Sequence, residues 1–276
     1  MNRALDSAHG AAARAEDSAA LRGLARAGFA MSGLVHILMG WIALRVALGG
    51  SGDSADQSGA IAQIAQAPGG RILLGVGAVA MAALALWNLL SAYLQGRREN
   101  ETAKVVGTAV KLVGKGAVFG ALAATAATFA LGSSSSSGQQ TQDAASPLLT
   151  SMIGRGLIVV AGLVVIGIGG YHVYKGVTRK FEETLQGGPG GKLATAVVVT
   201  GVAGFVAKGI ALIAVGVLLA WAGIGADPEK ASGLDAGLRS MAALPAGTVL
   251  LALVGIGLAL YGVFSFFRAR YEDLDA

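Results

Sequence analysis

The stretch LIVVAGLVVIGIGG, residues 157–170, contains no charged and no polar side chain. A strand of a membrane barrel alternates apolar and polar residues, and this uninterrupted run contradicts that pattern. Lipid offers backbone groups no hydrogen-bond partner, whereas a helix satisfies them within the segment. We therefore expect residues 157–174 to form a helix that crosses a bilayer.

Five further segments share this apolar composition. A bilayer core about 30 Å thick takes about 20 apolar helical residues to cross. The chain of 276 residues is 54% hydrophobic and only 13% charged, whereas soluble domains contain roughly 25% charged residues. The sequence therefore predicts an all-α membrane protein with six transmembrane helices. The predicted spans are residues 27–48, 72–94, 105–131, 157–174, 193–222 and 246–267.

Most of the 21 basic residues lie on one side of these spans. Cytoplasmic segments of membrane proteins carry an excess of Lys and Arg. We therefore expect both termini in the cytoplasm and the protein in the plasma membrane, the inner membrane of a bacterium. The basic residues on this side are Arg3, Arg14, Arg22, Arg26, Arg97, Arg98, Lys104, Lys111, Lys175, Arg179, Lys180, Lys192, Arg268 and Arg270.

Two segments outside the spans have a distinct composition. Residues 1–20 lack the apolar core of a cleavable signal peptide, so the first span is expected to act as the insertion signal. Residues 132–147, GSSSSSGQQTQDAASP, are polar and of low complexity, and we expect an exposed outer loop there.

The spans repeat as a pair. The odd spans align at Ser32-Gly33, Lys115-Gly116 and Lys208-Gly209. The even spans align without gaps as WNLLSAYLQGRR (87–98), YHVYKGVTRKFE (171–182) and YGVFSFFRARYE (261–272). We therefore predict three tandem helix-hairpin repeats with pseudo-threefold symmetry along the membrane normal. The predicted parts are a flexible cytoplasmic segment, 1–23, and repeats at 24–101, 102–185 and 186–274.

Glycine is abundant, with 43 residues in the chain. Small residues let membrane helices approach closely, so we expect the glycines inside the spans to serve mainly packing, as in Gly116-xxx-Gly120-xxx-Ala124.

The repeat layout resembles a known family. Three copies of a two-helix unit, each with an aromatic residue before a basic exit, are similar to the bacterial membrane proteins grouped as domain of unknown function 1206. The exits are Tyr171 to Phe181 and Tyr261 to Tyr271, and the likeness covers about residues 24–274. The first copy departs from the pattern, with Ser32 in place of Lys and Trp87 in place of Tyr. The resemblance implies a six-span bacterial membrane protein and carries no activity.

Polar residues inside the spans are the candidate site. The repeat alignment places Ser32, Lys115 and Lys208 at equivalent positions, and an intramembrane Lys is costly. One interpretation is a cationic site for an anionic ligand or an acidic lipid head group. The other is that each Lys extends its ammonium to the head groups, which we favour for Lys115, while Lys208 leaves both interpretations open.

Five further residues complete the speculative ligand-binding set: His36, Asn88, His172, Tyr171 and Tyr261. A single His in a span more often hydrogen-bonds a neighbouring helix than binds a ligand. The aromatic residues before the basic exits are either interfacial anchors or a layer in the core. With no Cys and three His in the chain, we expect no metal and no other cofactor.

Two functions fit these observations. The first is a structural, accessory or lipid-interacting bundle. The alternative is a small transporter or channel with a cationic site at Lys115 and Lys208. We expect no enzyme, because the spans contain no nucleophile–base pair, carboxylate dyad or HExxH motif. The expected partners are membrane lipids, chiefly anionic head groups at the cytoplasmic face, and a second copy or another membrane protein; we expect no nucleic acid.

Overall fold

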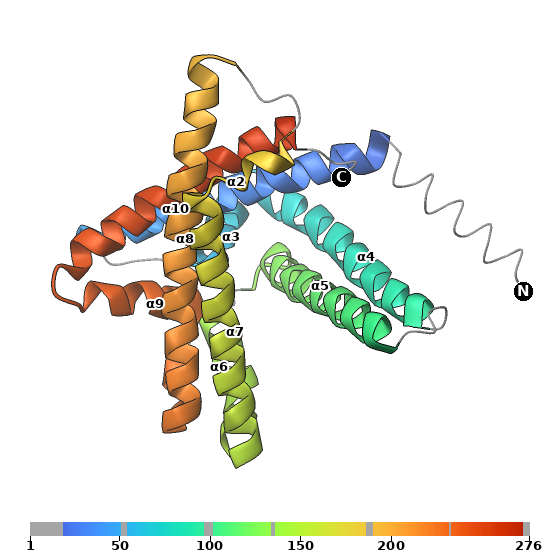
Figure 1. The fold of residues 1–276 in the computed structure, drawn as a ribbon, viewed down its shortest axis with the longest axis vertical. Coiled ribbons are helices and arrows are strands. Elements are labelled where there is room, and N and C mark those ends of the chain that lie inside the picture. The colour runs from blue at the N-terminus through green and yellow to red at the C-terminus, as the bar shows by residue number, and fades with distance from the viewer. Residues whose placement is uncertain are drawn as a thin grey trace, which may run out of the picture. The chain divides into compact units, whose positions relative to one another are not determined.

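A computed structural model describes residues 19–50, 54–96, 102–133, 136–185, 190–231 and 233–272. In these residues each predicted span corresponds to one long helix, and each helix holds a segment long and apolar enough to cross a membrane (Figure 1). The long helices are α2 (Ala19–Ala47), α4 (Gly70–Gly96), α5 (Thr102–Ala130), α7 (Met152–Val177), α8 (Lys192–Gly225) and α10 (Gly247–Tyr271).

Short helices follow the first span of each repeat. They are α3 (Gln57–Gln66), α6 (Ser137–Leu149) and α9 (Gly233–Ala242), with 3-10 turns η1 (Glu182–Thr184) and η2 (Pro228–Lys230). The prediction of an exposed loop over residues 132–147 is therefore wrong for residues 137–147, which lie in α6. Ala145 and Leu149, four residues apart on one face of α6, are buried against Ile158 of α7 and Ala222 of α8. Two apolar side chains on one helical face are enough to dock a segment whose composition is otherwise polar.

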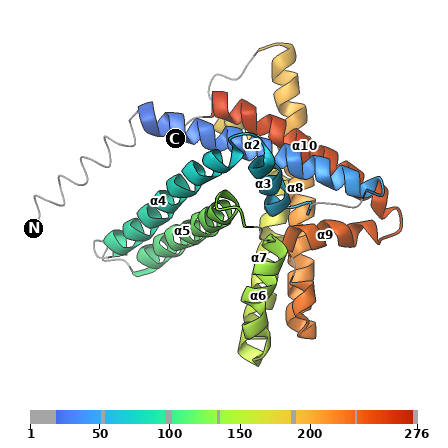
Figure 2. The same cartoon turned by 180° about the vertical axis from the view of Figure 1, so that it is seen from behind.

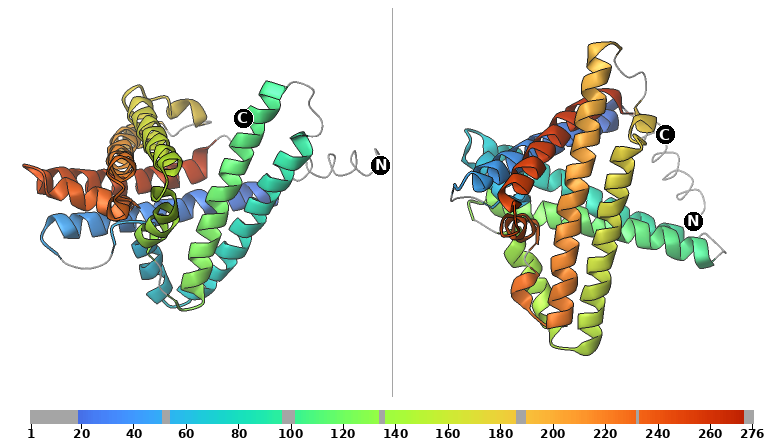
Figure 3. Two further views of the ribbon diagram at one scale, coloured as in Figure 1. Left: turned by 90° about the horizontal axis from the view of Figure 1, so that it is seen from below. Right: turned by 60° about the vertical axis from the view of Figure 1, so that its left-hand side comes forward.

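The described chain divides into two compact units. In one unit, which joins the residues up to Gln57 with those from Thr141 onward, α7 pairs with α8, α10 pairs with α2, and α8 also contacts α10. Figure 1 and both views of Figure 3 show α7 running beside α8, and the α2–α10 pair crossing them. In the other unit, residues 58–140, α4 lies beside α5 (Figure 2).

The pairing differs from the expected hairpins. Each close pair joins the second span of one repeat to the first span of the next, and the last span, α10, pairs with the first, α2. The sequence predicted pairs made by the two spans of one repeat. Pairing within a repeat and pairing between repeats are both compatible with six apolar spans. Only the residues at the helix contacts distinguish the two arrangements. The pseudo-threefold axis stays a prediction.

Glycine backbones meet along the α7–α8 pair. A Cβ added to Gly162 would lie 2.7 Å from the carbonyl oxygen of Gly216, and one added to Gly169 would lie 2.7 Å from that of Gly209. These glycines are seven residues apart on each helix, which is nearly two turns and therefore one face. The contacting residue numbers rise on one helix as they fall on the other, so the two helices are antiparallel.

The α10–α2 pair repeats this arrangement. A Cβ on Gly262 would lie 2.5 Å from the carbonyl oxygen of Gly33, and one on Gly40 would lie 2.4 Å from that of Gly255. In the α4–α5 pair alanine replaces most of the glycines. Gly116 faces Ala85, and the buried alanines on that face are again seven residues apart: Ala78, Ala85 and Ala92 on α4, with Ala123 on α5. Small residues with the same spacing of seven therefore lie at the contact of all three helix pairs and let the helices pack closely.

These contacts correct the alignment of the even spans. Gly169 faces Gly209 as Gly262 faces Gly33, while Gly33 and Gly209 are equivalent in the odd spans. The residues equivalent to one another are therefore Ala85, Gly169 and Gly262. The third copy must move by three residues from the alignment that the aromatic residues suggested, so Tyr171 corresponds to Phe264 rather than to Tyr261. The small residues at the helix interface, and not the aromatics, define the repeat.

Two adjacent glycines provide a direct test of this packing. A Cβ at Gly169 would be overpacked against α8, whereas one at Gly170 meets nothing within 4 Å. We expect Gly169→Ala to lower the free energy of unfolding by about 1–3 kcal/mol. Gly170→Ala should be neutral or stabilising by up to about 1 kcal/mol, because alanine favours the helix. Thermal unfolding in detergent measures both, and equal effects of the two variants would contradict the packing.

Candidate functional site

An aromatic cluster lies where α8, α10 and the segment after α7 meet. Its buried residues are Phe181, Val197, Phe205, Tyr261 and Phe264. The ring of Phe205 meets that of Tyr261 edge to face at 5.3 Å between centroids, and it stacks on Phe181 at 5.4 Å. Such aromatic pairs stabilise beyond the area they bury. The cluster therefore gives the cationic residues around it a rigid support.

Glycines on α8 make room for this cluster. A Cβ at Gly201 would lie 2.4 Å from the ring of Phe181, and one at Gly204 would lie 2.5 Å from Cα of Tyr261. The segment after α7 is also held by a bridge between Leu185 and Glu272, at the end of α10. The local sequence of α8 thus allows two other segments to approach its backbone at one level.

Lys208 and His36 both lie against Tyr261. The ammonium of Lys208 is 4.3 Å from the centroid of the Tyr261 ring, and the ring of His36 is 4.7 Å from it. His36 comes from α2, where its Nδ1 donates to the carbonyl oxygen of Ser32 at 2.7 Å. The hydroxyl of Ser32 lies 3.4 Å from the same nitrogen. Two helices, α2 and α8, therefore place polar groups beside one tyrosine of a third helix, α10.

His172 and Lys175 of α7 approach the other ring of the pair. The His172 ring is 5.8 Å from that of Phe205, and the Lys175 ammonium is 5.3 Å from its centroid. Both residues lie on one face of α7, three positions apart. His172 is within electrostatic reach of both Lys175 and Lys208. The imidazole therefore lies in the field of two ammonium groups.

The glycine contacts between α7 and α8 show which residue of α7 lies beside Lys208. Because Gly209 faces Gly169, Lys208 is level with Gly170, seven residues before α7 ends at Val177. At 1.5 Å per residue this is about 10 Å along the helix. Lys175 is two residues from that end. Lys208 therefore lies farther from the end of α7 than Lys175 does, along the same pair of helices.

The cation over Phe205 has a counterpart in the α10–α2 pair. At the equivalent positions, Arg268 lies 4.2 Å from the Phe29 ring. Arg268 also forms an ion pair with Glu272, with Nε 2.7 Å from Oε2. Arg179 occupies the position equivalent to Glu272. Within the described residues, no carboxylate lies within 4 Å of the ammonium of Lys175 or Lys208.

The structure brings together five of the eight predicted site residues: Ser32, His36, His172, Lys208 and Tyr261. Tyr171 lies 57% exposed on another face of α7, where it packs on Tyr174. Asn88 is in the other unit and donates to the carbonyl oxygen of Leu84 at 2.7 Å. The side chain of Lys115 lies outside the described residues, as do that of Trp87 and residues 1–18.

Three polar side chains at equivalent positions make the same local bond. Asn88, His172 and Ser265 each bond to the carbonyl oxygen one turn earlier, at 2.7, 2.8 and 2.9 Å. This bond satisfies a polar side chain inside an apolar helix. Asn88 and His172 therefore have a structural role whether or not they also meet a ligand.

Sequence reasoning missed Lys175 and Phe205. Each stands three residues from a residue that it did identify, His172 or Lys208, and hence on the same helical face. That spacing was the available signal. Among the described residues no group of three or more His, Cys, Asp or Glu side chains could hold a metal ion.

The comparison with protein families agrees with this architecture. The model of the family described as Domain of Unknown Function (DUF1206) matches residues 27–95, 110–179 and 203–272, one two-span copy each. The chain belongs to this family. The three matched segments end at equivalent residues by the small-residue register derived above, so the DUF1206 copies and the helix contacts define the same repeat. Together with the six apolar helices, this makes the chain a multi-pass membrane protein.

One curated relative of this DUF1206 protein spans nearly its full length. The Uncharacterized protein YxxB of Bacillus subtilis (strain 168) is 28% identical over 257 residues, which cover 90% of each chain. No solved structure matches the chain.

Removing the charge of Lys208 tests how that charge is balanced. An intramembrane Lys costs about 2.5–3.5 kcal/mol on insertion scales, and contact with an aromatic face returns about 0.5–2 kcal/mol. We therefore expect Lys208→Met to raise the free energy of unfolding of lipid-depleted protein by about 1 kcal/mol. Thermal unfolding in neutral detergent measures the change. A variant clearly less stable than the parent would mean that another group already neutralises Lys208.

Proposed function

We propose that this protein is a lipid-interacting bundle of the plasma membrane, with both termini in the cytoplasm and anionic lipids held at its cytoplasmic end. The observation that carries the proposal is the outer face of α7. This face is apolar over most of its length, then aromatic, then cationic, in the order of the layers of a lipid leaflet. Its exposed residues include Leu157, Val160, Val164, Ile168, Tyr171 and Tyr174, followed after the helix by Arg179 and Lys180.

Lys180 supports this reading through its contact with an exposed aromatic ring. Its ammonium is 5.1 Å from the centroid of the Tyr174 ring. A hydrogen bond with the Tyr174 side chain raises the pKa of Lys180, so the group stays charged. Lys192, at the start of α8, is exposed as well. Glu182 and Glu183 offset part of this charge, so that residues 178–192 contain three basic and two acidic residues.

The opposite end of the α7–α8 pair has a different charge balance. There Lys230 lies 5.0 Å from the centroid of the Trp221 ring, and Asp227 is 3.1 Å from its ammonium. The two ends thus each place a lysine over an aromatic ring, but within the described residues only the lysine at the Trp221 end forms an ion pair. This asymmetry favours an anionic leaflet at the Lys180 end, and we propose that this end is cytoplasmic because most of the basic residues of the sequence lie on its side of the spans.

The helix contacts bear on how the three repeats are arranged. We infer a pseudo-threefold axis along the membrane normal. One small-residue register occurs in all three pairs, and α10 returns to α2. Since α10 and α2 are antiparallel, the start of α2 and the end of α10 lie at one end of their pair, as N-in and C-in termini require.

The two lysines provide a matched test of the lipid proposal. Each basic residue near an anionic membrane surface contributes about 1 kcal/mol, or roughly a fivefold change in affinity. We expect Lys180→Gln to reduce the preference for phosphatidylglycerol over phosphatidylcholine by about this factor. Lys230→Gln should change it little, because Asp227 already balances that charge. Native mass spectrometry of the protein in mixed-lipid nanodiscs reports the ratio of the two bound lipids. Equal effects of both variants would refute the assignment of the anionic leaflet to the Lys180 end.

A small anion transporter or channel is the second candidate. The observation that favours it is Lys208, which lies within the spans beside His36 and His172 rather than at their ends. This function predicts anion flux in proteoliposomes that Lys208→Met abolishes. Bound lipid without flux favours the bundle.

A further inference from the structure

We infer that Lys175 and Lys208 together bind one phosphate group, between α7, α8 and α10, against the rings of Phe205 and Tyr261. This inference rests on the proposed function for the placement of the helices in a membrane, and it adds a discrete site with a ligand class. The site is distinct from the exposed segment around Lys180, which meets the bulk leaflet.

Lys175 and Lys208 form no ion pair within the described residues. Lys208 is half-buried and lies 4.3 Å from the Tyr261 centroid. An aromatic face offsets part of the cost of burying an ammonium but carries no net charge. Within the described residues no carboxylate is near enough to Lys175 or Lys208 to form an ion pair. A bound anion would balance these two cations, for which no described carboxylate forms an ion pair.

The α10–α2 pair contains an equivalent cation–aromatic contact that has a carboxylate partner. Arg268 and Phe29 form the same cation–aromatic contact in the α10–α2 pair that Lys175 and Phe205 form in the α7–α8 pair. The first contact is completed by the carboxylate of Glu272. At the corresponding position the second contact has Arg179, a further cation. In the α10–α2 pair the carboxylate of Glu272 thus neutralises the cation over the aromatic ring. In the α7–α8 pair the equivalent position holds Arg179, so this contact has no carboxylate there.

The hydrogen-bond donors of Lys175 and Lys208 lie along the same pair of helices, close to the end of α7. Lys175 stands two residues from the end of α7, Lys208 is level with Gly170 on the same pair, and the ring of His172 lies 5.8 Å from that of Phe205. A phosphate has several acceptor oxygens and can accept from more than one donor at once, and lysine is a common phosphate ligand. The two lysines are five residues apart in level along α7, roughly 7–8 Å, so a phosphate between these levels would accept from both ammonium groups. Its position just inside a helix end is that of the phosphate layer of a leaflet.

A phosphate at this site has two possible sources. It is either the head group of an anionic phospholipid, whose chains would follow the exposed apolar face of α7, or free inorganic phosphate. The shared chemistry is the phosphate anion, and separate additions distinguish the two sources.

The experiment uses the full chain, depleted of lipid in neutral detergent and examined by native mass spectrometry. Phosphatidylglycerol is added in one arm and inorganic phosphate in the other. We expect one equivalent to bind tightly to the parent in one of the two arms. Lys208→Met and Lys175→Met should each weaken this binding about tenfold or more, because each removes a charged hydrogen-bond donor. Lys208→Arg, which keeps the charge, should bind within a few-fold of the parent.

Lys180→Gln is the control that separates this site from the bulk leaflet. It should leave the single tight equivalent unchanged while lowering the general preference for anionic lipid. If neither ligand binds at one equivalent, or if both methionine variants bind like the parent, the inference is wrong. If the lysine-dependent equivalent persists but Lys180→Gln does not alter lipid preference, the site stands and the proposed assignment of the leaflet fails. The thermal stability of each variant shows that a loss of binding is not a loss of folding.

Discussion

The close approach of glycine backbones is the constraint on which the rest of this structure depends. Lipid tails are as apolar as the side chains of a span, so membrane helices gain little from burying Leu or Val against one another. They gain from dispersion contacts at short range, and glycine permits the shortest. In the α7–α8 and α10–α2 pairs a carbonyl oxygen of one helix occupies the place of a Cβ on the other. Because these contacts recur every seven residues, they fix both the facing surfaces and the axial register of each pair.

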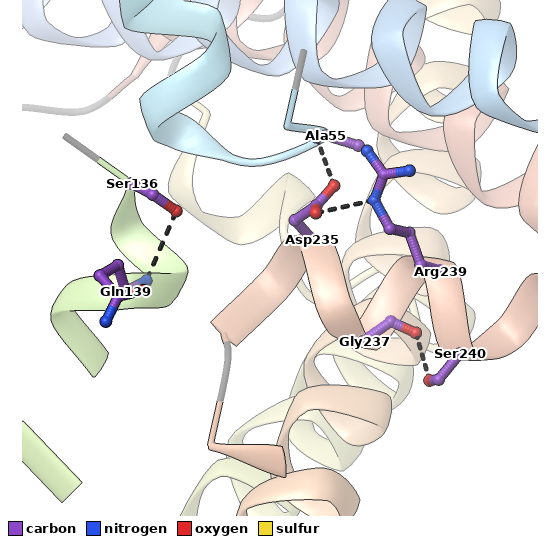
Figure 4. A network of polar contacts seen from close by, with 7 residues as sticks. All are labelled: Ala55, Ser136, Gln139, Asp235, Gly237, Arg239 and Ser240. Atoms are coloured by element: carbon purple, nitrogen blue, oxygen red, sulfur yellow. Dashed lines mark hydrogen bonds and ion pairs between the residues drawn. The ribbon is translucent and has the colours of Figure 1, made fainter. Parts of the chain in front are cut away.

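That register determines which polar groups can meet. Lys208 directly precedes Gly209, so the glycine that packs against Gly169 also fixes the level of the lysine on α7. Gly204 in turn admits the backbone of α10 and places Tyr261 under the Lys208 ammonium. The region around α9 is stabilised differently. There Asp235 of α9 accepts from the backbone nitrogen of Ala55 at 2.7 Å and from Nε of Arg239 at 2.8 Å, and the hydroxyl of Ser240 donates to Gly237 (Figure 4). In the other unit Ser136 accepts from the backbone nitrogen of Gln139 (Figure 4).

Much of this fold follows from sequence, because a 20-residue apolar run has few alternatives in lipid. The six spans and the equivalence of Gly33, Gly116 and Gly209 were predictable for that reason. The partner of each span was not, since its exposed and packed faces are nearly equally apolar: Leu163 is exposed, while Ile158 on the same helix is buried. The third even span was misaligned because Tyr261 resembles Tyr171, although the interface glycines carry the register. In the site, Lys208 and the two histidines were predictable as polar residues inside spans, whereas Phe205 looked like any other apolar residue until its neighbours were known.

The pairing of the last span with the first is the central claim, and a disulfide tests it most directly because the chain contains no cysteine. A Cβ on Gly255 would lie 3.3 Å from the Cβ of Ala43, close to the separation that a disulfide spans. Cysteines at these two positions should cross-link on mild oxidation in native membranes. Cysteines at Ala43 and Ile256, whose side chain is exposed, should not. Cross-linking of the first pair alone is the result the structure predicts. Failure of the first pair, or equal reaction of both, would show that α10 does not pack on α2 through this glycine face.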